Sequence, residues 1–155
     1  MRSHVATLVI GLAITAVGGF GADSSLGTWK LNPAKSKTTS ANPIRSQTDV
    51  REATPDGGVK VTRTGEYTDG TPINISFTYK YDGKQYPATG GMFDTLSVKR
   101  KDANTTTYEA RKTGGKFHLT GKTVVSKDGK TLTQSSTGAG ADGTPLTRTL
   151  VFEKQ

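Results

Sequence analysis

The sequence of 155 residues contains no cysteine. Disulfide bonds are therefore excluded, as are thiolate metal sites and thiol-based redox catalysis. Beyond the first 22 residues His118 is the only histidine, and one histidine cannot build a multi-histidine zinc site. The fold must be stabilised by burial and hydrogen bonding alone, and we expect no metal and no cofactor.

A long hydrophobic run is also missing. The apolar stretch from Val5 to Val17 covers about thirteen residues, whereas a spanning helix needs about twenty. It follows a basic start, Met1-Arg2-Ser3-His4, and precedes the small residues Gly18 to Ala22. This order is typical of a secretory signal peptide cleaved after Gly21 or Ala22, with an uncleaved anchor as the less favoured alternative. We predict a signal peptide over 1–22, a single domain over 23–155, and a secreted or periplasmic protein that is not integral to the membrane.

The net charge is +8, but the basic residues are scattered along the chain. A basic protein could attract anionic lipid head groups, lipopolysaccharide or nucleic acid. No basic run is interleaved with aromatics, so nucleic-acid binding is not expected. The scatter is more typical of a solvated surface on a small soluble protein, and we expect a monomer.

Five Asp-Gly pairs are the clearest positive feature, beginning at Asp56, Asp69, Asp82, Asp128 and Asp142. Asp-Gly is a strong signal for a two-residue hairpin of type I′, in which both central residues take positive φ. Because no D-x-D-x-D ladder surrounds these aspartates, we interpret them as hairpin corners and not as a calcium site.

Between the corners, apolar and polar residues alternate with a period of two. The clearest case runs from Ile73 to Tyr81, and the same pattern recurs around residues 59–67, 96–98, 108–110, 117–119, 132 and 146–152. Residues 32–43 are rich in Ser, Thr, Pro and Lys and are expected to form a long connection. The pattern predicts an all-β, antiparallel up-and-down meander of eight or nine strands. Because closure removes exposed strand edges, we expect a small barrel, with a bend or bulge at Gly121.

Both ends of the predicted domain resemble the calycin group. The opening Leu26-Gly27-Thr28-Trp29-Lys30-Leu31 is similar to the G-x-W signature of lipocalins, and the closing Phe152-Glu153-Lys154 looks like the end of fatty-acid-binding proteins. The resemblance implies a lipocalin-like barrel closed at one end by Trp29 and Phe152. The Arg-x-Tyr pair that reads the ligand in fatty-acid-binding proteins would fall on Leu150 and Phe152, so that mode of binding is not implied.

Two arginines lie in phase with apolar neighbours. Arg63 follows Val59 and Val61, and Arg148 lies between Leu146 and Leu150. Inside a barrel each could bind the carboxylate of a ligand. Alternatively, Arg148 stacks on Trp29 and Arg63 extends to the barrel mouth.

Aromatic residues supply much of the predicted interior, and the candidates for lining a ligand cavity are Tyr67, Phe77, Tyr79 and Tyr108. They could equally be ordinary core. His118 alternates with Phe117 and Leu119 and is expected to face solvent. With no recognisable acid–base constellation, we do not expect an enzyme. The leading hypothesis is binding of a small hydrophobic or amphiphilic ligand, which includes an anion bound by Arg63 or Arg148. The alternative is a filled barrel that binds a partner protein or an envelope polymer through its surface.

Overall fold

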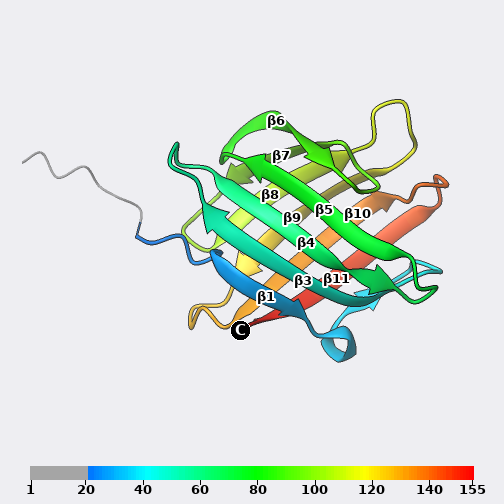
Figure 1. Cartoon of the computed structure of the whole chain (residues 1–155), viewed down its shortest axis with the longest axis horizontal. Coiled ribbons are helices and arrows are strands. Elements are labelled where there is room, and N and C mark those ends of the chain that lie inside the picture. The colour runs from blue at the N-terminus through cyan, green and yellow to red at the C-terminus, as the bar shows by residue number, and fades with distance from the viewer. Residues whose placement is uncertain (1–20) are drawn as a thin grey trace, which may run out of the picture.

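The computed structural model describes residues 21–155, so the predicted signal peptide lies outside the described residues except for Gly21 and Ala22. The chain forms one antiparallel sheet that curls into a barrel (Figure 1). Its elements are β1 (Gly27–Leu31), the 3-10 turn η1 (Pro33–Lys35), β2 (Lys37–Thr38), β3 (Ile44–Ala53), β4 (Val59–Tyr67), β5 (Pro72–Tyr79), β6 (Asp82–Thr89), β7 (Thr95–Arg100), β8 (Thr105–Arg111), β9 (His118–Val125), β10 (Thr131–Ala139) and β11 (Pro145–Lys154).

The barrel closes through β1, which pairs with β3 on one side and with β11 on the other. From β3 to β11 each strand pairs with the next along the chain, so the predicted up-and-down antiparallel barrel is confirmed. The predicted number of strands is wrong: ten strands form the wall, and β2 adds a short extra pairing to β11. In residues 21–155 no helix is long and apolar enough to cross a membrane.

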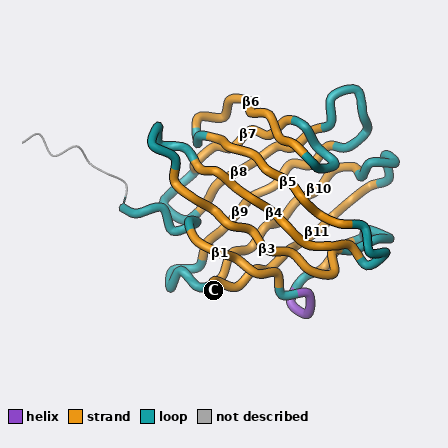
Figure 2. The backbone as a smooth tube through the Cα atoms, in the orientation of Figure 1, coloured by secondary structure: helices purple, strands orange, loops and turns teal. Residues whose placement is uncertain are grey.

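The sequence pattern did not reveal two of the wall strands, β6, which is mostly exposed, and β3. Strand β3 has a polar inner side. Its inward side carries Gln47, Asp49 and Arg51, all buried, while Thr48 and Val50 alternate with them. Alternation of apolar and polar residues does not reveal such a strand, because its buried residues are themselves polar. The predicted long connection over residues 32–43 likewise contains η1 and β2 (Figure 2).

Four of the five Asp-Gly pairs lie at hairpin corners, whereas Asp82-Gly83 forms the first two residues of β6. The predicted turn type is wrong. The glycine of each pair has a positive φ, but no described residue other than glycine does. The aspartates therefore keep ordinary backbone angles. At the first corner the Gly57 N–H donates to the Thr54 carbonyl, and the Thr54 N–H donates to the Gly58 carbonyl. This is a type I turn followed by a left-handed glycine.

The buried apolar residues form two clusters. The larger one is built by β4 to β9 with Phe93 and Leu146. The smaller one contains Trp29, Leu31, Val125, Leu132, Leu150 and Phe152. Trp29 and Phe152 are both fully buried, and the Trp29 indole N–H donates to the Ser25 carbonyl at 2.8 Å. The segment that precedes β1 is thereby tied to this end of the barrel.

Candidate functional site

A layer of polar side chains lies inside the barrel. Strand β3 contributes Gln47, Asp49 and Arg51, and its neighbour β4 contributes Arg63. Strands β9, β10 and β11 contribute Thr123, Gln134, Ser136 and Arg148. The register places Asp49 between Trp29 of β1 and Arg63 of β4. Buried polar groups are costly unless they are paired, so the partner of each group in this layer decides what the interior can bind.

Asp49 is the acidic centre of this layer and is almost completely buried, with 1% of its surface exposed. Arg63 donates to both carboxylate oxygens, from Nε at 2.9 Å and from an Nη at 2.8 Å, and Gln47 donates at 2.9 Å. Arg51 lies 3.5 Å from the same carboxylate. Burial opposes ionisation of Asp49, but the charges of Arg63 and Arg51 and these hydrogen bonds outweigh it and lower the pKa of the carboxyl.

The layer carries an excess of positive charge. Arg51, Arg63 and Arg148 point inward, while Asp49 is the one buried carboxylate of residues 21–155. Arg63 takes both oxygens of Asp49 in a bidentate pair. Arg148 donates through Nε to the Ser136 hydroxyl at 3.1 Å, and no ion pair to a described acidic residue involves it. Two of three guanidinium charges therefore lack a carboxylate of their own.

A cavity of about 50 Å³ lies beside this layer, with a second of about 20 Å³ next to it. Arg51, Arg63, Arg148 and Tyr108 line the larger cavity on its polar side, and apolar residues line the rest: Val61, Phe77, Phe93, Leu96, Val98 and Ala110. Two buried polar atoms at this cavity have no hydrogen-bond partner among the described residues, Arg51 Nε and the Tyr108 hydroxyl. A site that places unused donors beside a positive charge fits an anion.

The size of the cavity restricts the ligand. A water needs ~10–15 Å³ measured in this way, so the larger cavity, with the smaller one beside it, holds a few waters or a small carboxylate. Pockets for drug-sized molecules are ~300–1,000 Å³. The interior is thus too small for a drug-sized molecule, and the predicted small hydrophobic or amphiphilic ligand would have to be compact.

Most of the sequence-predicted site residues meet at this interior. Arg63, Phe77, Tyr79, Tyr108 and Arg148 line the larger cavity. Tyr67 lines the smaller one with Arg63 and Arg148; burial raises the pKa of its hydroxyl, and the two arginine charges oppose that rise.

Two structural alternatives for the arginines are wrong. Arg63 does not extend to the barrel mouth, because it is buried and paired with Asp49. Arg148 does not stack on Trp29; the cation near the indole ring is Lys154, at 5.2 Å. His118 is partly exposed, and its Nε2 lies 3.3 Å from Glu109.

The sequence interpretation missed Asp49, Arg51, Gln47 and Gln134. A signal was present: Gln47, Asp49 and Arg51 recur with the period of a strand, two residues apart, directly before the strand that carries Arg63. A carboxylate flanked by amide and guanidinium groups at this spacing is the partner that a buried Arg63 requires.

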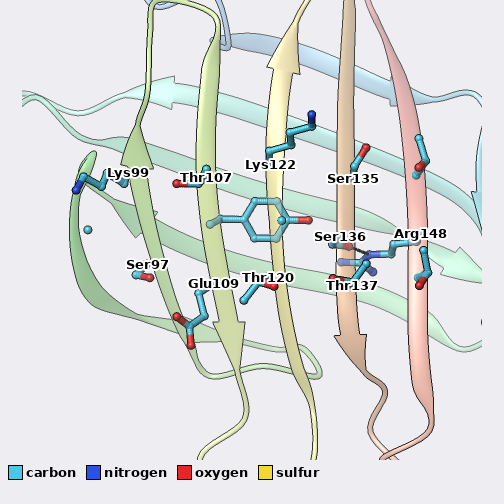
Figure 3. A pocket seen from close by; sticks show the side chains of 15 residues that line it. Ser97, Lys99, Thr107, Glu109, Thr120, Lys122, Ser135, Ser136, Thr137 and Arg148 are labelled. Atoms are coloured by element: carbon cyan, nitrogen blue, oxygen red, sulfur yellow. Dashed lines mark hydrogen bonds between the residues drawn. The ribbon is translucent and has the colours of Figure 1, made fainter.

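A roomier hollow of about 690 Å³ lies on the outer face of β7 to β11 (Figure 3). Hydroxyl groups, two lysines and one carboxylate line it: Ser97, Lys99, Thr107, Glu109, Thr120, Lys122, Ser135, Thr137, Thr147 and Thr149. Tyr108, Ser136 and Arg148 of the interior layer also border it. Gly121 lies at its floor. The register runs through Gly121 without the predicted bulge, and a Cβ there would lie 2.3 Å from the Ser135 carbonyl oxygen and 2.9 Å from Tyr108 Cζ. The glycine leaves room for the Tyr108 ring.

No protein-family model and no curated protein matches this sequence. Among solved structures, the complex described as EF1p2_mFAP2b bound to DFHBI is similar at a TM-score of 0.48 and 11% identity, over 85% of this chain and 94% of that one. In residues 21–155 no three His, Cys, Asp or Glu side chains gather where they could hold a metal ion.

Proposed function

We propose that this protein is a small-ligand-binding barrel whose ligand is a compact organic anion, held in the interior by Arg148 and Arg51 beside the Tyr108 hydroxyl. The observation that carries the proposal is the charge imbalance of the interior: it holds three inward guanidinium groups and one buried carboxylate, which only Arg51 and Arg63 approach. An anion would bring charge and acceptors to donors that have none, Arg51 Nε and Tyr108 Oη.

The apolar lining defines the rest of the ligand. Phe77 and Phe93 pack edge to face with ring centroids 5.8 Å apart, and both line the larger cavity with Leu96 and Val98. A carboxylate bearing a methyl group or a small ring would place its charge on the arginines and its carbon atoms on this apolar side. Long acyl chains need volume that the interior does not offer.

The proposal is tested by the thermal stability of the protein in acetate and benzoate. The neutral amides acetamide and benzamide serve as isosteric controls, with sodium chloride added to match ionic strength. A ligand at 100 times its dissociation constant raises the free energy of unfolding by about 2.7 kcal/mol. We expect the carboxylates, and not the amides, to raise the unfolding temperature.

Matched arginine variants locate the effect. Arg148→Gln should abolish the carboxylate-dependent stabilisation, because it removes an inward charge. Arg45→Gln should keep it, since Arg45 is exposed and pairs with Glu66 at 3.5 Å. Equal stabilisation of both variants, or equal effects of carboxylate and amide, would refute interior anion binding.

The outer hollow supports a second candidate function, an interaction surface for a hydroxylated or anionic polymer. It is supported by the volume of the hollow, which far exceeds that of the interior, and by the positions of Lys99 and Lys122 among the hydroxyls. Binding of an anionic polysaccharide that weakens with salt and is lost in the Lys99→Gln/Lys122→Gln double variant would favour it. Binding unchanged in that variant would exclude it.

A further inference from the structure

The barrel wall has one weak seam, between β5 and β6. These strands have eight residues each, yet only two pairs join them, Ser76 with Thr89 and Phe77 with Ala88. Other hairpins are joined along their whole length, as in β10–β11, where nine pairs run from Thr131–Glu153 to Ala139–Pro145. Figures 1 and 2 show β6 arching away from β5.

Pro87 explains where the pairing stops. The Ala88 N–H donates to the Asp94 carbonyl on the β7 side, so the preceding nitrogen, that of Pro87, faces β5. Successive backbone groups of a strand point to opposite neighbours, and proline has no N–H to donate. The β5–β6 ladder therefore loses the hydrogen bond that this nitrogen would donate, directly next to its last pair.

The opposite end of β6 is held firmly. Gly90 follows the two pairs and packs so closely on β5 that a Cβ would lie 2.0 Å from the Asn74 carbonyl oxygen. Strand β6 stays paired with β7 from Asp82 to Pro87, with a register irregularity between Asp82 and Gln85. The half of β6 nearest the turn can thus separate from β5 without breaking ladder hydrogen bonds to it.

The interior cavity lies behind this seam. Phe77 and Tyr79 of β5 and Leu96 and Val98 of β7 line it, whereas no residue of β6 does. Strands β5 and β7 also contact each other directly. On the inner side of β6, the half-buried Tyr86 ring packs against the larger apolar cluster, and its hydroxyl donates to Asp82 at 2.8 Å, within β6 itself.

We infer that the β5–β6 seam is the route by which a ligand reaches the interior, with residues 82–86 as the moving part and Tyr86 as the side chain that covers the opening. The inference rests on the proposed function, because it needs an interior ligand. Opening here costs no ladder hydrogen bonds, while every other seam whose strands are fully paired would have to break several.

Amide hydrogen exchange tests the seam without any ligand. Within residues 78–86, the amides that face the seam, and not β4 or β7, should exchange much faster than those of residues 132–139, which are paired on both sides. Comparable protection of the two segments would overturn the inference whether or not the barrel binds anions.

Cross-linking tests the route itself. Thr78 and Pro87 are the next opposite positions after the last pair, and the chain has no cysteine of its own, so a Thr78→Cys/Pro87→Cys variant forms a single removable lock. A Ser76→Cys/Thr89→Cys variant locks the part that is already paired and serves as the control. Benzoate association is followed by NMR line shape in both, oxidised and reduced.

We expect oxidation of the Thr78/Pro87 variant to slow association and dissociation of benzoate together, and oxidation of the control to change neither. Unchanged rates in the oxidised lock, with benzoate still bound, would overturn the route and leave the interior site standing. Failure of the wild-type protein to bind benzoate at all would overturn the proposed function and the route with it.

Discussion

Asp49 is the residue on which the interior depends most. Removing its charge leaves Arg63 and Arg51 buried without a counter-charge, and breaking a buried pair costs ~3–5 kcal/mol. We therefore expect Asp49→Asn to lower the free energy of unfolding by about that amount in urea titrations. Glu153→Gln, which removes an exposed partner of Lys35, is the control and should change stability far less. Similar losses in the two variants would contradict this account of the interior.

The same residue predicts a dependence on pH. Because the folded-state pKa of Asp49 lies below its unfolded value, its contribution to stability is present above the unfolded pKa and is lost as pH falls through the folded pKa. Wild-type stability should therefore fall on acidification below about pH 4. Surface aspartates such as Asp128 and Asp142 contribute to the fall, since their pKa values are also lowered, by hydrogen bonds within the turns. The difference in free energy of unfolding between wild type and Asp49→Asn reports on the buried carboxylate alone. This difference should become smaller at low pH. A difference that does not change with pH would show that Asp49 is not the group responsible.

Substitution of Tyr108 should affect stability and ligand response in different ways. Its hydroxyl is buried without a partner, and an unsatisfied buried hydroxyl destabilises a protein. Tyr108→Phe should leave the free energy of unfolding unchanged or raise it, while weakening the carboxylate-dependent stabilisation. Loss of stability without any change in carboxylate response would indicate that the hydroxyl has a structural partner instead.

At the scale of elements, the segment before β1 closes one end of the barrel. Asp23 accepts hydrogen bonds from the Tyr81 hydroxyl at 2.5 Å and from Arg100 at 3.0 Å, and the Arg100 guanidinium lies 3.9 Å from the Tyr81 ring centroid. Burial raises the pKa of Asp23, but hydrogen bonds from Tyr81 and Ser25 and the charge of Arg100 outweigh it and lower the pKa overall. The carboxylate is therefore charged, and the contact kept, at neutral pH.

Asp23→Asn should loosen this segment. We expect faster proteolysis within residues 21–26 and faster exchange of the Trp29 indole N–H, whose acceptor is the Ser25 carbonyl. Asp56→Asn removes a carboxylate that contacts Lys80 at a hairpin tip and should change neither. If the Trp29 indole N–H exchanges equally slowly in both variants, Asp23 does not hold the segment in place.

The elements also show what the sequence could predict. Strands with apolar alternation, such as β5, were predicted correctly, because burial of one face imposes the period directly on residue type. Strand β3 was not, since its buried side is polar and its stability comes from pairing with Arg63 on another strand. Glycine marked the corners, but the turn type depends on local hydrogen bonds that the Asp-Gly dipeptide alone does not fix.

At the scale of the whole molecule, the site follows from closure. Arg63 and Arg148 are 85 residues apart in the sequence, and only the closed barrel brings both to one cavity. Their inward phase was readable from the sequence, whereas the contact of Arg63 with Asp49 and the small volume of the cavity required the packing of all ten wall strands. Our proposal therefore narrows the predicted small hydrophobic or amphiphilic ligand to a compact organic anion.

The measurement that tests the central claim most directly is an isotope-filtered NOE experiment with acetate labelled at its methyl carbon. Bound in the interior, the methyl protons should show NOEs to the rings of Phe77 and Tyr108, which line the cavity beside Arg148. The Arg148→Gln variant should lose these NOEs. Contacts confined to surface residues such as Lys99 and Lys122, or interior NOEs that persist in Arg148→Gln, would contradict the account.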